Sequence, residues 1–258
     1  MNVVVCVKHV PDTEAQVRLR ADGRGVDESG LNFVLNYYDE HGVEEALRIK
    51  ERLGGTVTLV TAGPARAVEG LRAGLAMGAD AAVHIQDQVV AGLDHIGTAR
   101  VLAAAIKPLP CDLVLCGKLA TDDNAGIVGP ALAEFLGLPQ ATAVTKLELG
   151  DGRRATAHRE VEGAVETLEV RLPAVITVER GINEPRYPSL PGIMRAKRTA
   201  ITVRRLADLG MSTPPTAHVE LLQLAPPPKR QAGRRLEGEA AAVVGELIRA
   251  LREEAKVL

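Results

Sequence analysis

The first 140 residues alternate short, β-branched apolar runs with stretches whose apolar residues recur at helical spacing. This alternation predicts a doubly wound, mainly parallel α/β sheet with right-handed crossovers and helices on both faces. In such sheets, ligands bind beyond the carboxyl ends of the strands. The expected strands are residues 2–10, 56–63, 81–86 and 111–117, and the expected helices are residues 39–55, 64–79, 98–109 and 129–137.

Two smaller features lie between the first strand and the first helix. Residues 16–20 and 23–27 are suited to a small hairpin around a glycine-containing turn. Asn36 and Asp39 are both candidates to cap the helix that follows, because a short polar side chain can accept a hydrogen bond from a free N–H of the first turn.

The pattern changes to β-rich runs over residues 142–205, and the first of these runs leave no room for helices between them. The "GDG" at residues 150–152 is suited to the tight turn of a hairpin. We therefore expect an antiparallel extension of a single α/β domain that spans residues 1–224. Residues 225–258 read as a Pro-rich linker followed by an amphipathic helix. The helix carries Val244, Leu247, Ile248 and Leu251 on one stripe, and the linker would let it dock on another chain.

Composition excludes several classes of function. The 31 basic and 33 acidic residues nearly cancel, which argues against nucleic-acid binding and against a membrane-surface protein. No apolar stretch is long enough to insert into a membrane. Cys6, Cys111 and Cys116 lack metal-type spacing and indicate reduced thiols in a cytoplasmic protein. The six histidines form no metal or triad pattern, so we expect no metal and a binding or carrier role rather than an enzyme.

The segment "GKLATDDNAGIVG" at residues 117–129 is the best candidate for a ligand loop. It joins a strand to a helix, and its glycines would let backbone amides approach a phosphate. The loop matches neither a P-loop nor G-x-G-x-x-G. An ordinary strand-to-helix loop with polar caps remains the alternative, in which Asp122 and Asp123 would interact with the helix dipole.

A second unusual segment, residues 181–198, carries an apolar side chain among basic ones. Seven basic residues and one acidic residue lie in residues 180–205, with Arg180 and Arg205 included. Leu190 stands between Pro188 and Pro191, which stiffen the chain before any partner binds. The segment is suited to docking on an acidic partner with an apolar pocket, and a solvated charged loop is the alternative.

The sequence "ERGINEPRYPSLPGIMRAKR" closely resembles the signature of the electron transfer flavoprotein beta-subunit family, in which N-x-P-R-Y-x-x-L-P-x-I-M-x-A-K is a highly specific run. The resemblance extends over nearly the whole chain. Matching stretches are "VVVCVKHVPDT", "NYYDEHGVEEALRIKE", "TAGPA", "LRAGLAMGAD", "DLVLCGKLATDD" and "EGAVETLEVRLPAVITV".

The resemblance implies a Rossmann-like fold of the adenine-nucleotide-binding type and a heterodimer with an alpha subunit that holds most of the FAD. The flavin would accept electrons from acyl-CoA dehydrogenases and other flavin dehydrogenases, in fatty acid oxidation, and pass them to a quinone oxidoreductase. The beta subunit would bind AMP and carry the dehydrogenase-recognition loop at residues 181–198.

The resemblance also implies roles for individual residues. The AMP site would lie in the run from Leu113 to Val128 and in three other places, and its residues would be Cys6, Asn36, Tyr37, Tyr38, Asp39, Ala62, Leu115, Cys116, Gly117, Lys118, Thr121, Asp122, Asp123, Asn124, Ala125, Gly126, Ile127 and Val128. Thr13 and Tyr38 would approach the flavin. The docking residues would be Leu190, Ile193, Met194, Arg195, Lys197 and Arg198.

The chain departs from the family pattern at the nucleotide loop. Many members read D-D-x-x-N-Q-T-G-Q, whereas this chain reads "DDNAGIVGP", which is nearer to relatives that bind a second FAD and split electron pairs between two acceptors. Those relatives usually have glycine where Asp123 stands. AMP is therefore the first expectation and a second FAD the alternative. A stand-alone nucleotide-binding hydrolase and a structural scaffold are two further alternatives.

Overall fold

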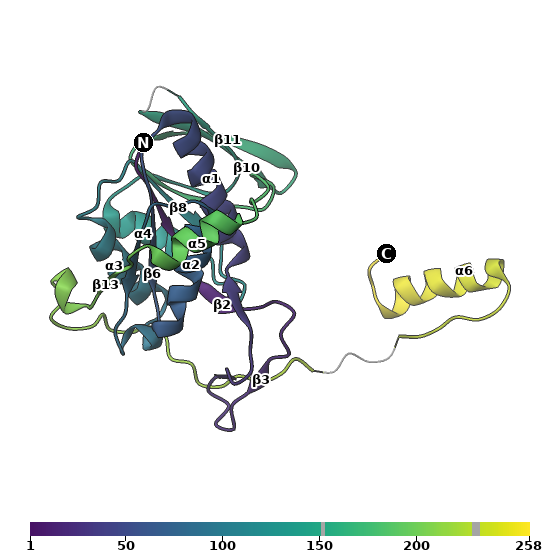
Figure 1. Ribbon diagram of the computed structural model, residues 1–258. Coiled ribbons are helices and arrows are strands. Elements are labelled where there is room, and N and C mark those ends of the chain that lie inside the picture. The colour runs from purple at the N-terminus through teal and green to yellow at the C-terminus, as the bar shows by residue number, and fades with distance from the viewer. Residues whose placement is uncertain (151–152, 229–232) are drawn as a thin grey trace.

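The computed structural model describes residues 1–150, 153–228 and 233–258, and these form a nine-stranded sheet with helices on both faces (Figure 1). From edge to edge the strand order is β11-β10-β9-β12-β8-β1-β6-β7-β13. The strands are β1 (Val3–Cys6), β6 (Val57–Ala62), β7 (Ala81–Ile85), β8 (Leu113–Gly117), β9 (Gln140–Leu149), β10 (Arg154–Val161), β11 (Ala164–Arg171), β12 (Ala174–Val178) and β13 (Thr202–Arg204).

The four predicted strands β1, β6, β7 and β8 are parallel neighbours, which confirms the doubly wound α/β fold. Alternate residues of β1 pack on opposite faces of the sheet. Val3 and Val5 pack in one apolar core and Val4 and Cys6 in the other, because successive side chains of a strand point to opposite faces. The first core includes α1 (Tyr37–Leu53) and α2 (Val68–Met77), and the second includes α3 (His95–Ile106) and α4 (Val128–Leu136).

The β-rich region is not wholly antiparallel, contrary to the expectation. Strands β9, β10 and β11 form antiparallel pairs, but β12 lies between β8 and β9 and is parallel to both. Strand β13 lies at the opposite edge, parallel to β7. The sequence of β12, AVITV, suits this internal position, because all five residues are buried and a continuous apolar run is typical of an internal parallel strand. The predicted turn at 150–152 includes residues 151–152, which lie outside the described part of the chain.

The predicted first strand is divided in two. After β1 the chain leaves the main sheet, and β2 (His9–Pro11) pairs antiparallel with β5 (Phe33–Leu35). The predicted small hairpin is present as β3 (Arg18–Leu19) and β4 (Val26–Asp27). These two small sheets stand beyond the carboxyl end of β1.

The segment expected to be a stiff loop contains a helix, α5 (Leu190–Arg198). Ser189 caps it, since its side-chain oxygen accepts a hydrogen bond from the Gly192 N–H at 3.2 Å. Pro191 falls in the first turn, where a missing N–H costs no intrahelical bond. The second proline of the pair therefore begins a helix instead of extending the chain. α5 packs on α2 so closely that a Cβ at residue 192 would lie 2.4 Å from the Ala76 carbonyl oxygen.

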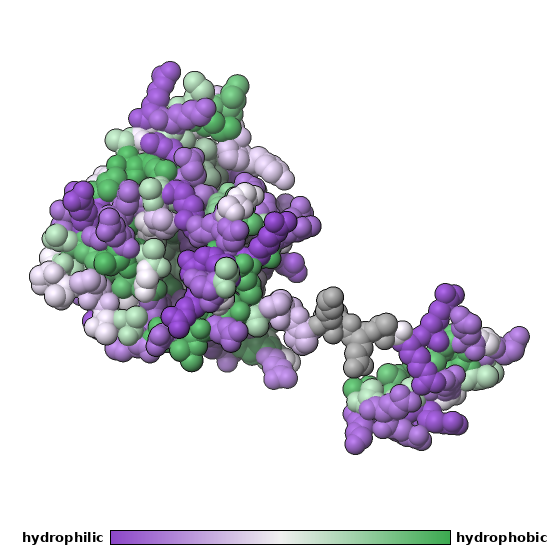
Figure 2. Space-filling model, turned by 90° about the horizontal axis from the view of Figure 1, so that it is seen from below, coloured by the Kyte–Doolittle hydropathy of each residue, from purple (hydrophilic) through white to green (hydrophobic). Residues whose placement is uncertain are grey.

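The C-terminal helix, α6 (Ala240–Arg249), lies apart from the sheet and continues into a π-helical turn at Ala250–Glu254 (Figure 1). Three members of the predicted stripe, Val244, Leu247 and Ile248, are exposed, and Figure 2 shows hydrophobic atoms on this separate helix. Part of the predicted linker, residues 229–232, lies outside the described residues. Docking of α6 on another chain stays a prediction. None of the helices in the described ranges is both long and apolar enough to cross a membrane.

Candidate functional site

A cavity of about 600 Å³ lies beyond the carboxyl ends of β1, β6 and β8. Lys8, Gly63 and Lys118, which follow these three strands within two residues, line it. The start of α4 lies on its wall as well. Parallel strands bring these exits to one edge of the sheet, so segments more than 100 residues apart in sequence meet there.

Thirteen of the residues expected at a nucleotide site line this one cavity. They are Cys6, Asn36, Asp39, Ala62, Cys116, Gly117, Lys118, Asp122, Asp123, Ala125, Gly126, Ile127 and Val128. Five others do not line it, namely Tyr37, Tyr38, Leu115, Thr121 and Asn124. Leu115 is buried in the core on the α1 face of the sheet, because it alternates with Cys116 along β8.

Several cavity residues were missed by sequence reasoning. Lys8 and His9 follow β1, Phe33 begins β5, Arg66 lies in the helical turn before α2, and His95 is the first residue of α3. Lys8 and His9 lie within the expected first strand, residues 2–10, and reach the cavity because β1 ends earlier, at Cys6. The side chains of Phe33, Arg66 and His95 reach the cavity only through tertiary packing.

Asp39 connects two strand exits instead of capping α1. Its buried carboxylate accepts hydrogen bonds from the backbone N–H of Lys8 at 2.7 Å and of Gly117 at 3.0 Å. Burial raises the pKa of Asp39 to about 7, although hydrogen bonds from Asn36 and from these two amides act in the opposite direction. The group therefore loses its proton near neutral pH.

Asn36 occupies the N-cap position of α1, but its side chain makes no cap hydrogen bond. The amide instead donates to the Leu119 carbonyl oxygen at 2.9 Å and accepts from the Thr121 N–H at 3.1 Å. Asn36 thus holds the loop after β8 against the start of α1. Thr121, expected at the site, contributes through its backbone N–H.

Lys8 neutralises the carboxylate pair of the loop. Its Nζ atom lies 2.8 Å from Asp122 and 2.9 Å from Asp123, and His95 Nε2 lies 3.2 Å from the same Asp123 oxygen. Burial acts to raise the pKa of Asp123, but hydrogen bonds from the Ala125 N–H and from Lys8 outweigh it and lower the pKa. Asp122 and Asp123 do not lie at a helix start, because α4 begins only at Val128. The interpretation of the two carboxylates as helix caps is therefore wrong.

The loop then passes through left-handed conformations at Asn124, with φ of 52°, and Gly126, with φ of 64°, before α4 begins. Ile127 precedes the helix and makes no side-chain cap hydrogen bond. Free amides at a helix start favour an anion. A Cβ at Gly129 would lie 2.4 Å from the Thr177 methyl group, so close packing on β12 requires glycine there. This end of the cavity fits a phosphate group.

The remaining walls are of two kinds. Val90, Leu93 and Leu102 supply an apolar surface on the α3 side, which fits a flat base. On another wall, the guanidinium of Arg66 lies 4.3 Å from the centre of the Phe33 ring and is paired with Glu28 at 2.8 Å. A few polar groups around a mainly apolar hollow are typical of small-molecule sites.

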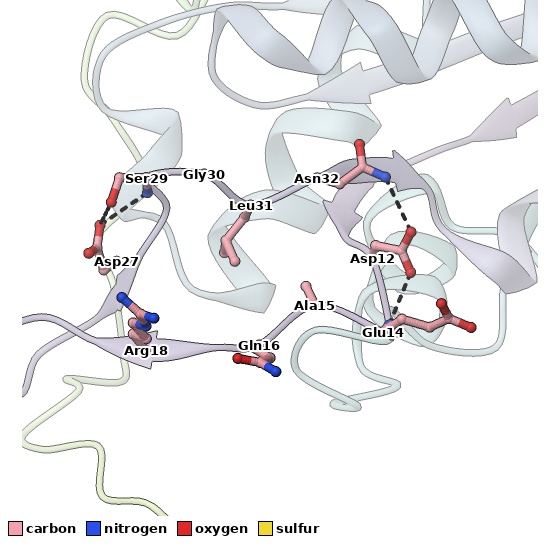
Figure 3. Close-up of a pocket in the computed structure, with 10 residues that line it drawn as sticks. All are labelled: Asp12, Glu14, Ala15, Gln16, Arg18, Asp27, Ser29, Gly30, Leu31 and Asn32. Carbon is pink, nitrogen blue, oxygen red and sulfur yellow. Dashed lines mark hydrogen bonds between the residues drawn. The ribbon is translucent and has the colours of Figure 1, made fainter.

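A second pocket, of about 490 Å³, lies beside the β3–β4 hairpin (Figure 3). Two of the carboxylates that line it, those of Asp12 and Asp27, accept hydrogen bonds from neighbouring residues. Asp12 accepts from the Glu14 N–H at 3.0 Å and from Asn32 at 3.2 Å, and Asp27 accepts from Ser29. Thr13, expected near the flavin, adjoins this pocket in sequence but lines neither cavity.

The expected docking residues lie on α5, on the surface. Leu190 is 73% exposed and Met194 is 47% exposed, and Ile193 is also exposed. Arg195, Lys197 and Arg198 are exposed in the last turn, whereas Ala196 is buried against α2. The helix thus presents apolar and basic side chains together, as the docking interpretation requires.

The three cysteines are free thiols. Burial raises the pKa of Cys111 to about 11, so this thiol is not a reactive one. In residues 1–150, 153–228 and 233–258 there is no group of three or more His, Cys, Asp or Glu side chains that could hold a metal ion.

The comparisons with known proteins agree with one another. Residues 24–209 match the electron transfer flavoprotein domain family. The chain is 41% identical over 261 residues to the electron transfer flavoprotein subunit beta of Bacillus subtilis, with all of both chains covered. It is 41% identical to that of Mycobacterium tuberculosis H37Rv and 39% identical to that of Bos taurus, each over 92% of this chain and 93% of the relative. Sequence, fold and comparisons together show that this chain belongs to the electron transfer flavoprotein beta-subunit family.

Proposed function

We propose that this chain pairs with an electron transfer flavoprotein alpha subunit that holds most of the FAD. The heterodimer takes electrons from acyl-CoA dehydrogenases and other flavin dehydrogenases and passes them to a quinone oxidoreductase, in cytoplasmic fatty acid oxidation. Electron transfer flavoprotein beta subunits are electron carriers and not catalytic enzymes. The observation that carries the proposal is the cavity at the strand exits, which has the features of a nucleotide site in a chain of this family.

The cavity binds AMP, with its parts in distinct roles. The amides at the start of α4, from Gly126 to Gly129, hold the phosphate. Val90, Leu93 and Leu102 pack against the adenine. Asp122 and Asp123 stand where carboxylates can accept hydrogen bonds from ribose hydroxyls, and Lys8 keeps their negative charge from repelling the phosphate. The nucleotide then fastens the exits of β1, β6 and β8 to one another.

A second FAD in the same cavity is the alternative, and one feature of the structure favours it. The cavity continues from α4 to Phe33 and Arg66, where an aromatic ring and a guanidinium offer a surface for a further group. Ala125, Ile127 and Val128 also replace polar residues of AMP-binding members. Asp123 favours AMP, since relatives with two flavins usually have glycine there.

The exposed face of α5 and the residues before it form the dehydrogenase-recognition segment. Leu190 fills an apolar pocket of the dehydrogenase, with Ile193 and Met194 beside it. Arg195, Lys197 and Arg198 attract the acidic rim of that pocket. The amphipathic α6, on its linker, docks on the alpha subunit.

The test is the cofactor content of the heterodimer. The chain is co-expressed with the alpha subunit encoded beside it, the complex is purified, and FAD and AMP are measured per heterodimer after denaturation. One FAD and one AMP support the proposal. Two FAD and no AMP assign the cavity to a second flavin, and failure of the two chains to associate overturns the carrier function.

A further inference from the structure

The segment that precedes α5 is fastened to α1 by an ion-pair cluster around one buried carboxylate, Glu44. Arg186 makes two contacts with Glu44, from Nε at 2.8 Å and from Nη2 at 3.1 Å. It makes two more with Glu51, from Nη1 at 2.5 Å and from Nη2 at 3.2 Å. Its backbone N–H also donates to Glu44 at 3.2 Å. One guanidinium thus binds two carboxylates that lie two turns apart on α1.

Glu44 is the fixed point of this cluster, because it is only 3% exposed. Arg48 donates a further hydrogen bond to it at 2.8 Å. Burial acts to raise the pKa of Glu44, yet the bonds from Arg186 and Arg48 outweigh it and lower the pKa. The carboxylate is therefore charged at neutral pH, and its strong, planar partner is Arg186.

A second contact holds the same segment three residues earlier. Asn183 is buried, and its amide donates to the His41 carbonyl oxygen and to Glu45, each at 3.0 Å. The apolar side chains that come next are exposed: Tyr187 is 96% exposed and Leu190 is 73% exposed. One buried anchor, Asn183, and one half-buried anchor, Arg186, thus precede the most exposed apolar side chains of the segment.

We propose that Arg186 is a positioning residue for partner docking, which holds residues 187–190 in the conformation that the partner binds. The inference rests on the proposed function of α5. Arg186 itself need not touch the partner, since its side chain is turned to α1. Its contribution is that the segment is ordered before the encounter, which removes an entropic cost from association.

Releasing the segment would transfer that cost to the docking step. Fixing the backbone of one residue costs about 1–2 kcal/mol, so freeing even one residue near Tyr187 corresponds to about a tenfold weaker docking. The electron-transfer step in the docked complex should be unaffected, because residues 187–190 make the same contacts with the partner once it is bound. The Michaelis constant for the carrier should therefore rise while the limiting rate stays the same.

The experiment uses the purified heterodimer with Arg186→Gln and with Arg186→Lys. Arg52→Gln is the charge-matched control, because Arg52 is an exposed residue of α1 beside Glu51. Glu51→Gln removes the exposed half of the cluster and leaves Glu44 paired, so it is informative if Arg186→Gln proves too unstable to purify. Leu190→Ala is the reference for the docking surface itself.

The first measurement is hydrogen exchange of the amides of residues 187–194 in the free heterodimer, which needs no partner. We expect faster exchange in Arg186→Gln and Glu51→Gln, partial recovery in Arg186→Lys, and no change in Arg52→Gln. Wild-type exchange in both cluster variants would overturn the proposal.

The second measurement is the reduction rate of the heterodimer by an acyl-CoA dehydrogenase, as a function of heterodimer concentration. A Michaelis constant about tenfold higher in Arg186→Gln, with an unchanged limiting rate and unchanged cofactor content, supports the proposal. If Leu190→Ala weakens docking and Arg186→Gln does not, Arg186 has no positioning role. If Leu190→Ala has no effect either, the proposed docking function of α5 fails, and the exchange data still decide whether Arg186 orders the segment.

Discussion

The Oδ1 atom of Asp39 lies 3.0 Å from the backbone nitrogen of Gly117, and a Cβ at residue 117 would lie 2.3 Å from that same oxygen. The Asp39 carboxylate that accepts this hydrogen bond therefore also occupies the space that a side chain at residue 117 would need. It joins the first turn of α1 to the end of β8, at the floor of the cavity. Two predictions concern this contact.

Replacement of the glycine should disturb both the fold and the site. In Gly117→Ala, the added methyl group would also meet the Tyr38 Cβ at 2.8 Å. We expect the free energy of unfolding to fall by about 1–3 kcal/mol, as for other overpacked positions, and the nucleotide content of the heterodimer to fall with it. Urea denaturation and nucleotide release measure the two effects. Gly92→Ala is the control, because nothing lies within 4 Å of its Cβ position; equal stability of the two variants would refute the contact.

The raised pKa of Asp39 predicts a pH dependence of stability. The folded chain holds this proton up to about pH 7, whereas the unfolded chain loses it near pH 4. The stability contribution of Asp39 is therefore fully present below about pH 4 and is lost as pH rises through 7. The difference corresponds to about 4 kcal/mol. Asp39→Asn cannot ionise, so the wild type should lose stability relative to this variant between about pH 4 and 7. Parallel curves for the two proteins in urea denaturation would contradict the prediction.

Leu190→Ala tests the apolar part of the docking surface. Burial of a leucine side chain contributes roughly 1.5–3 kcal/mol, which corresponds to a ten- to hundredfold change in affinity. We expect electron acceptance from a dehydrogenase to weaken by that amount at limiting heterodimer, with FAD and nucleotide content unchanged. Leu53→Ala, at an exposed leucine of α1, should behave as wild type. Unchanged rates for Leu190→Ala would remove this residue from docking.

Charge reversal tests the basic part of the same surface. Lys197→Glu with Arg198→Glu should slow association with the dehydrogenase by about tenfold at low salt, because long-range attraction speeds encounter. The difference should shrink as salt rises, since the Debye length falls to about 3 Å at 1 M. Stopped-flow association rates over a range of salt measure it. The control is the reversed pair Lys107→Glu with Lys146→Glu, at exposed positions after α3 and on β9, and an equal effect in the two pairs would reject the docking role.

Much of the fold could be predicted because its signals are local. The buried valines of β1 and the glycines that end α1 and α2 act over a few residues, through strand periodicity and helix termination. The direction and order of the later strands could not be predicted in this way. β12 is parallel and internal because it pairs with two parallel neighbours, β8 and β9. The sequence AVITV does not specify which strands these neighbours are. The helix at Leu190–Arg198 was missed because a proline pair reads as extended chain unless the second proline is recognised as a first-turn residue.

The sequence by itself determined the family, the alternation of strands and helices, and the positions of the cavity loop and of the unusual segment at residues 181–198, since each is a contiguous pattern of residues. Only the tertiary structure decided which side chains meet. Lys8 pairs with Asp122 across 114 residues and Arg186 with Glu44 across 142. These pairs form because parallel strands bring distant exits to one edge and because α1 passes beside the segment before α5. Such proximity is a property of packing, which no local pattern of residues encodes.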